Sequence, residues 1–190
     1  MNYDLQKADL SVVVAEAGLV ADETRRIFGQ LSAAQINWKP GQGDWSIGQC
    51  FDHLTIANRP YLPIIQEIRQ GRKRPRLRER LPLLPGLFGK MIIKTLQPDS
   101  GRKVKARPQF LPSSTAIDPG IIGAFLDQQE SLVKEMKATR ELELERITIT
   151  SPILSLITYS LMDAYRIIVV HEQNHFVQAR RVLEAPGFPT

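Results

Sequence analysis

The sequence predicts an all-α protein, a four-helix bundle with a long crossover connection between its second and third helices. Apolar residues recur at three- and four-residue spacing in four long segments, and helix-capping patterns precede some of them. Residues 72–117, between the second and third segments, have no sustained period. No segment has a strong strand period, although the short β-branched piece 147–150 is ambiguous. We expect one domain, residues 1–190.

The first predicted helix covers residues 4–31. Its apolar positions form one face: Leu10, Val13, Val14, Ala17, Ala21, Thr24, Ile27, Phe28 and Leu31. A polar stretch around Pro40 then interrupts the pattern. Trp38 and Trp45 flank this stretch, and we expect both to pack at the end of the bundle.

The second predicted helix covers residues 47–71. Ser46 and Gln49 have the spacing of a capping box, in which hydroxyl and amide satisfy backbone donors reciprocally. Pro60 and Pro63 each remove a backbone donor, so we expect them to bend this helix.

The connection that follows is strongly basic. Residues 69–107 contain thirteen Lys or Arg against only Glu79 and Asp99, whereas the whole chain has a net charge of +5. Within it, residues 87–96 are expected to form a short helix. We expect the connection to be solvated and paired with the acidic remainder of the chain, although such a segment could also contact anionic partners.

Two further helices are predicted after the connection. Asp118 as cap and Pro119 at the first helical position start the third helix, which runs to about Thr139. Ser160 and Asp163 repeat the capping spacing before the fourth helix. One face of the fourth helix carries Leu161, Ala164, Ile168, His171, His175, Ala179 and Val182 and continues toward Pro186.

Composition excludes several classes of protein. The single cysteine, Cys50, excludes an internal disulfide and a cysteine-rich zinc module, so any metal must be bound by histidine and oxygen ligands. We expect Cys50 to be a small buried hydrophobic residue. The sequence shows no signal peptide and no apolar run long enough to span a bilayer, so we expect a cytoplasmic protein without a membrane partner.

The three histidines are the candidate metal ligands. His171 and His175 are four residues apart, so their imidazoles project side by side from the core face of the fourth helix. His53 lies on another predicted helix among apolar residues. Burying three imidazoles without partners is costly, and coordination would satisfy them together. The alternative is three core histidines hydrogen-bonded to polar neighbours.

Two other metal sites fit less well. A ferritin-like di-iron site needs two E-x-x-H motifs, and only Glu172 to His175 provides one. Residues 171–175, H-E-Q-N-H, also match the zinc-protease pattern, but that class usually takes a third ligand from further along the chain and contains a sheet. We therefore expect Glu172 to be exposed or to support a ligand from behind.

Three segments carry a family resemblance: W-S-I-G-Q-C-F-D-H-L at 45–54, K-V-K-A-R-P-Q-F-L-P at 103–112, and H-E-Q-N-H-F-V-Q-A-R-R-V at 171–182. They resemble the DinB-like (DinB/YfiT) superfamily, whose members are regarded as metalloenzymes. The resemblance implies that His53, His171 and His175 bind nickel, zinc or a similar divalent ion, with water at the open positions.

The resemblance also implies a class of reaction. Characterised relatives include transferases and isomerases that use low-molecular-weight thiols, and other members are described as metal-dependent hydrolases. We expect a metal-dependent enzyme with a small-molecule substrate, in which Gln49, Asn174 and Gln178 could orient ligands or substrate. The alternative is a non-catalytic binding bundle with a structural or vestigial metal site. We also expect a homodimer, and no nucleic-acid partner.

Overall fold

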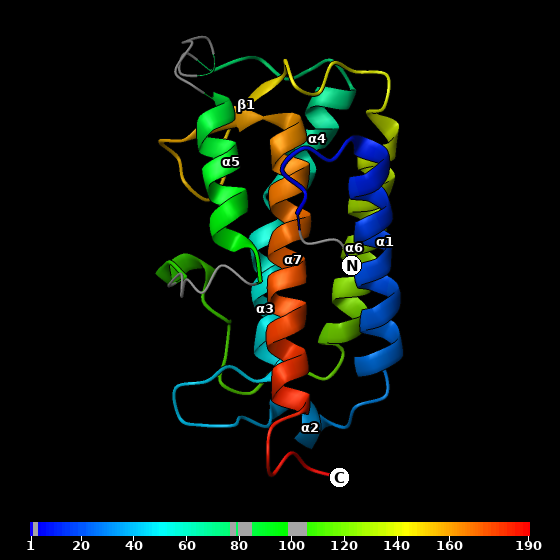
Figure 1. Ribbon diagram of the computed structural model, residues 1–190, viewed down its shortest axis with the longest axis vertical. Coiled ribbons are helices and arrows are strands. Elements are labelled where there is room, and N and C mark those ends of the chain that lie inside the picture. The colour runs from blue at the N-terminus through cyan, green and yellow to red at the C-terminus, as the bar shows by residue number, and fades with distance from the viewer. Residues whose placement is uncertain (2–3, 77–78, 80–84, 99–105) are drawn as a thin grey trace.

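The structure, a computed structural model, describes residues 1, 4–76, 79, 85–98 and 106–190. It is mostly helical (Figure 1), so the all-α prediction is confirmed. The elements in chain order are α1 (Leu10–Phe28), α2 (Ala33–Asn37), α3 (Ile47–Asn58), α4 (Tyr61–Arg69), α5 (Pro85–Leu96), a 3₁₀ turn η2 (Pro108–Phe110), α6 (Ile121–Ala138), β1 (Thr148–Thr150), β2 (Thr158–Ser160) and α7 (Leu161–Leu183).

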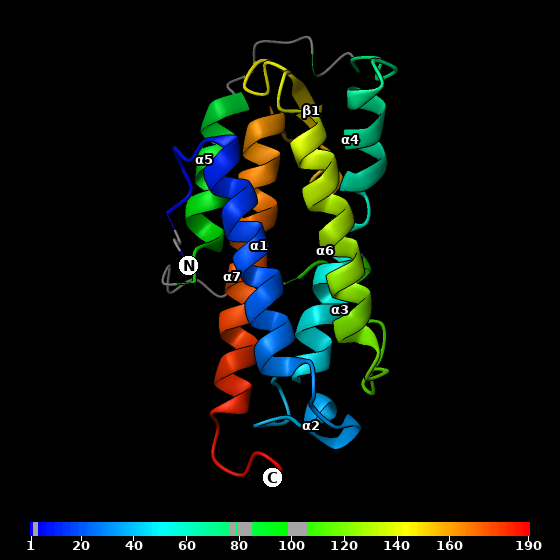
Figure 2. The ribbon, with the colours of Figure 1, turned by 90° about the vertical axis from the view of Figure 1, so that its right-hand side faces the viewer.

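The helices α1, α3, α6 and α7 run along the long axis of the molecule and pack against one another (Figures 1 and 2). Around the core, α1 contacts α6, α6 contacts α3, α3 contacts α7, and α7 contacts α1. At one end α4 follows α3 and packs against α6, and α5 packs against α7 and β2. No helix among the described residues is long and apolar enough to cross a lipid bilayer.

Side-chain caps fix where several helices begin. Ser46 and Ser160 start α3 and α7 as predicted, because each hydroxyl accepts a hydrogen bond from the backbone N–H three residues later. The predicted start of the first helix is wrong. The Asp9 carboxylate caps α1, and the buried Leu5 extends the apolar pattern into a segment that is not helical.

Two other predicted boundaries also differ from the structure, and one short helix was not predicted. The second helix is divided into α3 and α4, because Pro60 cannot donate the backbone hydrogen bond that would continue it. Gly120, rather than Asp118, is the cap residue of α6. The short helix α2 was not predicted, although Ser32 and Gln35 form a capping box there.

A small antiparallel sheet contains most of the ambiguous β-branched piece 147–150. In it β1 pairs with β2, and Ile149 lies opposite Tyr159. Both side chains are buried against the first core cluster defined below. Three residues are too few to show a period of two, so the β-branched composition of 147–150 was the only available signal.

Two apolar clusters fill the interior. Between them lies a layer of buried polar side chains, to which each of the helices α1, α3, α6 and α7 contributes. The first core cluster includes Val13, Ile65, Leu132, Met136, Tyr165 and Ile168. The second includes Phe28, Phe51, Leu54, Phe125 and Phe176. The polar layer between them consists of Glu16, Asn58, Gln129, Glu172 and Gln173, all at most 8% exposed.

The described part of the basic connection is partly anchored to the rest of the chain. The predicted short helix 87–96 is confirmed within α5, and its Ile93 is fully buried. Lys73 forms an ion pair with Glu79 at 2.6 Å and donates a hydrogen bond to the carbonyl of Thr148. Through α5, the connection therefore covers the core of its own chain.

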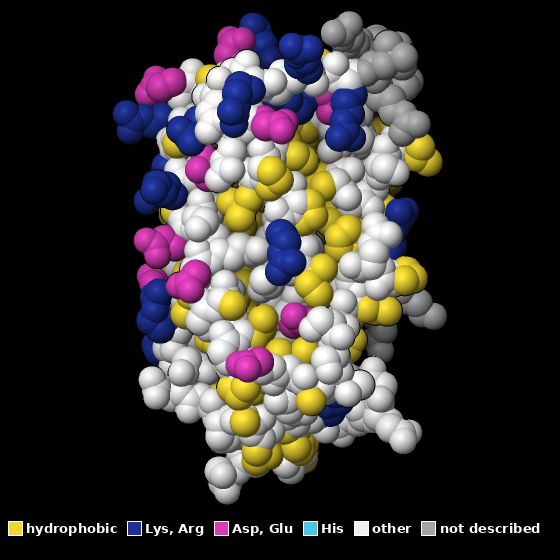
Figure 3. All heavy atoms as spheres, turned by 180° about the vertical axis from the view of Figure 1, so that it is seen from behind, with side chains coloured by type: hydrophobic (Ala, Val, Ile, Leu, Met, Phe, Trp, Pro, Cys, Tyr) yellow, Lys and Arg dark blue, Asp and Glu magenta, His cyan; other side chains and the backbone are white. Residues whose placement is uncertain are grey.

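Other basic residues of the connection face solvent. Arg72, Arg74 and Arg76 are exposed. On the face opposite to that of Figure 1, Lys and Arg gather at one end of the molecule (Figure 3). Five further basic residues of this stretch, Arg78, Arg80, Arg102, Lys103 and Lys105, lie outside the described residues.

Candidate metal centre

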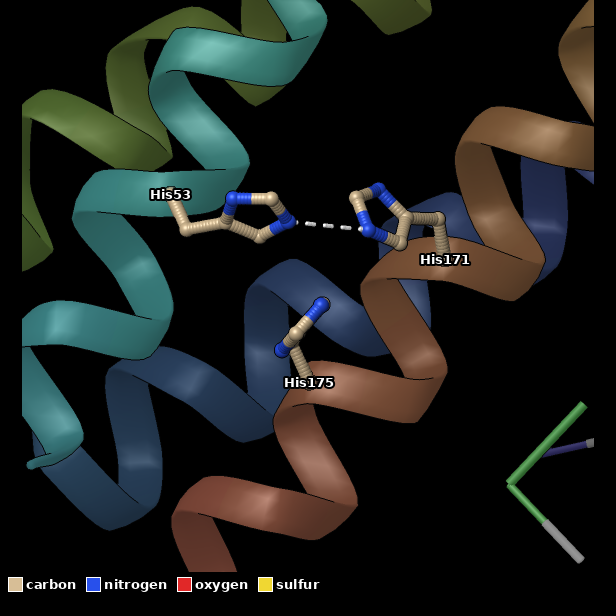
Figure 4. Close-up of side chains that lie close together, drawn as sticks. All are labelled: His53, His171 and His175. Atoms are coloured by element: carbon tan, nitrogen blue, oxygen red, sulfur yellow. Dashed lines mark hydrogen bonds between the residues drawn. The ribbon is translucent and has the colours of Figure 1, made fainter. Parts of the chain in front are cut away.

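The three histidines of the chain meet between α3 and α7 (Figure 4). His53 comes from α3, and His171 and His175 come from successive turns of α7. The ring centroids are 4.6–5.0 Å apart, and one nitrogen from each ring lies within 4.8 Å of the other two. The structure thus brings together the predicted ligand residues in a group that could bind one metal ion.

Helix packing produces this arrangement. On α7 the four-residue spacing places His171 and His175 on one face. Because α3 packs against that face, His53 points toward the pair, and its Nε2 lies 3.1 Å from Nε2 of His171. His53 is 5% exposed, whereas His171 and His175 are partly exposed residues. The cluster therefore has a dry side and a side that solvent can reach.

Hydrogen bonds orient two of the three rings. The Nδ1 of His53 contacts the backbone carbonyl of Phe110, and the Nδ1 of His175 lies 2.8 Å from Oε1 of Gln178. Carbonyl oxygens only accept, so each Nδ1 must carry the proton and each Nε2 must present a lone pair. This second hydrogen bond from a ring is typical of histidines that bind metals.

The donor set fits a divalent cation. The Nε2 lone pair of His53 faces the Nε2 of His171 at 3.1 Å, and such a contact requires either a proton on one nitrogen or a cation between them. Three neutral imidazoles suit zinc, nickel and similar ions, with metal–nitrogen distances of about 2.0–2.1 Å for zinc.

Electrostatics keeps these imidazoles neutral. Burial lowers the pKa of His53, although the Phe110 carbonyl and Asp52 act in the opposite direction. Burial and the neighbouring imidazoles lower the pKa of His171 well below 6.5. Burial, together with His53, lowers the pKa of His175 to about 3. Neutral imidazole is the form that binds metal, so protons compete weakly with an ion here.

The lowered pKa values predict a small proton release on metal binding. At pH 6.0 three imidazoles with a pKa of 6.5 would release about two protons, and we expect fewer than about one. Stability of the metal-free protein should fall as the pH decreases below 6.5, because the unfolded imidazoles bind protons that the folded ones do not. Zinc calorimetry in two buffers of different ionisation enthalpy measures the proton count. Release of two or more protons would contradict the prediction.

The side chains predicted to support the site behave differently from one another. Gln178 bonds to His175. The Gln49 side chain makes its hydrogen bonds away from the imidazoles: it caps α3 at Ser46 and donates to the carbonyl of Ser114. Asn174 is partly buried, and its side chain makes no hydrogen bond within the described part of the chain. Cys50 is fully buried, and burial raises the pKa of its thiol, as expected for a small core residue.

The expectation that Trp45 packs at the end of the bundle did not include a contact with the histidines: the side chain packs against the second core cluster and also lies against two imidazoles. Its indole lies nearly parallel to the His175 ring, with centroids 5.6 Å apart, and 5.0 Å from the His53 ring. Trp38 does pack at that end, against Phe188. The sequence did offer a signal that Trp45 lies near the site, because Trp45 directly precedes Ser46, the cap of the helix that carries His53.

Glu172 is not exposed, contrary to one of the two expectations for it. Its side chain is fully buried and accepts hydrogen bonds from Nδ2 of Asn58 and Nε2 of Gln129, both at 2.7 Å. Burial raises its pKa to about 8, although both amides act in the opposite direction. Because each carboxylate oxygen is bound to an amide inside the core, Glu172 is not positioned as the general base of a zinc protease.

These features define the chain as an all-α protein with a three-histidine cluster between two of its helices. Its sequence matches the family model of the DinB superfamily over residues 18–179. The chain therefore belongs to the DinB superfamily, and the predicted resemblance is confirmed. No curated protein and no solved structure matches it in the corresponding comparisons.

Proposed function

We propose that this protein is a metal-dependent enzyme in which His53, His171 and His175 bind one divalent ion, nickel or zinc. The helices α1, α3, α6 and α7 form the four-helix bundle that carries the site. The proposed reaction is transfer or isomerisation with a low-molecular-weight thiol, or hydrolysis of a small molecule. The main support is the set of converging imidazole nitrogens, two of which are oriented through their opposite ring nitrogens.

The ligand set favours catalysis over a purely structural role. Structural zinc sites usually have four protein ligands, whereas catalytic sites keep a position open. Three histidines form the group here, and two of the rings are partly exposed. A divalent ion held by the three histidines would act as a Lewis acid and would make an anionic oxygen or sulfur nucleophile available at neutral pH.

The protein residues would hold and shield this ion. The Phe110 carbonyl and Gln178 fix the His53 and His175 rings. The Trp45 indole stacks on the His175 ring and lies 5.0 Å from the His53 ring, so it would help to shield that side of the ion from water. A substrate would approach from the partly exposed side of His171 and His175.

Metal content and turnover test this proposal. Protein purified without an affinity tag should contain about one equivalent of metal by elemental mass spectrometry, or take it up from Ni²⁺ or Zn²⁺. Ni²⁺ should quench Trp45 fluorescence in a Trp38→Phe variant, where Trp45 is the only indole. The loaded protein should then turn over thiol-plus-electrophile or ester substrates and lose activity with a chelator.

Two results would contradict the proposal at different levels. No uptake of Ni²⁺ or Zn²⁺ would exclude the metal site. Stoichiometric uptake with closed coordination in the X-ray absorption spectrum, and no turnover with any thiol or ester substrate, would instead support a non-catalytic bundle with a structural ion.

A further inference from the structure

The carboxylate of Glu172 joins three helices inside the polar layer. It lies on α7 and accepts from Asn58 at the end of α3 and from Gln129 on α6, both at 2.7 Å. The Nε2 of Gln129 also lies 3.3 Å from the carbonyl of Ala17 on α1. All three side chains are at most 2% exposed. We call Asn58, Glu172 and Gln129 the polar clamp.

The polar clamp joins the same two helices that carry the histidines. Glu172 directly follows His171 on α7, and Asn58 lies five residues after His53 on α3. The separation between His53 and the α7 pair therefore depends on how α3 and α7 are placed relative to each other at this level. A fixed Asn58–Glu172 contact sets that placement.

General energetics indicates that such a clamp has a role beyond stability. Buried polar networks cost desolvation, and well-packed apolar side chains at the same positions are often as stable or more so. Apolar residues fill the bundle above and below this layer. Where buried polar groups are retained in helical assemblies, fixing the register between helices is their best-supported use.

We propose that the polar clamp positions the metal ligands: by joining α3 to α7, it holds His53 at the separation from His171 and His175 at which the three rings share one ion. This inference rests on the metal site proposed above. Glu172, Asn58 and Gln129 are positioning residues, since none of them hydrogen-bonds to an imidazole.

The chain offers a matched control in the same layer. The Nε2 of Gln173 on α7 donates to Oε2 of Glu16 on α1 at 3.0 Å. This pair is also a buried carboxylate–amide contact between two helices, but α1 carries no histidine. Breaking it should destabilise the fold without separating the ligand-bearing helices.

The test compares Glu172→Leu and Asn58→Ala with Glu16→Leu in the full-length protein loaded with Co²⁺. We measure the Co²⁺ dissociation constant, the visible absorption bands that report coordination geometry, and urea unfolding of the metal-free protein. The clamp variants should weaken Co²⁺ binding by about 10–100-fold and shift the bands. Glu172→Gln, which retains an acceptor for Asn58, should recover part of the affinity. Glu16→Leu should lower stability yet keep the wild-type bands and a dissociation constant within about twofold.

Each outcome bears on a different claim. The proposed role of the clamp would be overturned if Asn58→Ala and Glu172→Leu kept the wild-type Co²⁺ affinity and absorption bands. It would also be overturned if Glu16→Leu lost as much affinity as they do. In both cases the metal site itself would stand. If Glu172→Leu fails to fold, the milder Asn58→Ala variant alone decides whether the clamp positions the ligands. If the wild-type protein binds no Co²⁺, Ni²⁺ or Zn²⁺, the proposed function fails, and the clamp's role fails with it.

Discussion

Replacing His171 with alanine should weaken binding of Ni²⁺ or Zn²⁺ by more than about 100-fold. This loss of affinity is larger than the loss expected when only a residue that orients a ligand is removed. His171 lies close to both other rings, with its Nε2 3.1 Å from that of His53 and its ring centroid 4.7 Å from that of His175. The two remaining rings cannot hold an ion as tightly. Competition with a chromophoric chelator gives the two dissociation constants.

The same His171→Ala substitution should change stability by different amounts in the metal-free and the metal-bound protein. Without metal, the wild-type cluster holds neutral imidazoles whose burial disfavours protonation, so stability should change by only about 1 kcal/mol. With free metal at about 100 times the wild-type dissociation constant, the wild type gains about 2.7 kcal/mol and the variant gains little. Thermal unfolding with and without metal separates these effects.

Asn174→Ala is the control on the same helix. Asn174 is partly buried between the two α7 histidines in sequence, and its side chain makes no hydrogen bond within the described residues. It should bind metal as the wild type does. Equal metal affinity in His171→Ala and Asn174→Ala would show that His171 is not a ligand.

Local signals in the sequence predicted most of the helical fold. The capping serines start α3 and α7 at the predicted residues because a cap depends only on residues three apart. The errors arise where a tertiary contact competes with a local pattern. The first helix was predicted to begin too early, in a segment whose Leu5 is buried without being helical, and the β1–β2 pairing joins residues eight to twelve apart in strands too short to show a period.

The same distinction between local patterns and tertiary contacts applies to the candidate site. Helical spacing pairs His171 with His175, and the scarcity of histidine pointed to His53 as the third. Gln178, which orients the His175 ring, was predicted because it lies three residues away on the same helix. The other groups that orient the rings or hold the helices together were not predictable, because they come from distant parts of the chain. The Phe110 carbonyl is 57 residues from His53, and Asn58 is 114 residues from Glu172. Only packing of the helices reveals these partners.

Replacing Arg166 with alanine should lower the free energy of unfolding by about 3–5 kcal/mol at pH 7, because it leaves buried polar groups without their partner. The Arg166 guanidinium is 8% exposed and pairs with Asp163 at 2.9 Å and Glu145 at 2.8 Å. It also donates twice to the carbonyl of Ala8, which precedes the α1 cap. Urea denaturation measures the loss.

Both a control and the pH dependence identify the cause of this loss. Arg180→Ala, also on α7, removes an exposed pair with Glu184 and should cost less than about 0.5 kcal/mol. Burial raises the pKa of Asp163 although Arg166 opposes it, so in Arg166→Ala this pKa should rise further. A raised folded-state pKa destabilises at high pH, so the penalty should shrink as the pH falls toward about 4. A penalty that is independent of pH would show instead that lost packing, rather than the unpaired Asp163 carboxylate, destabilises the variant.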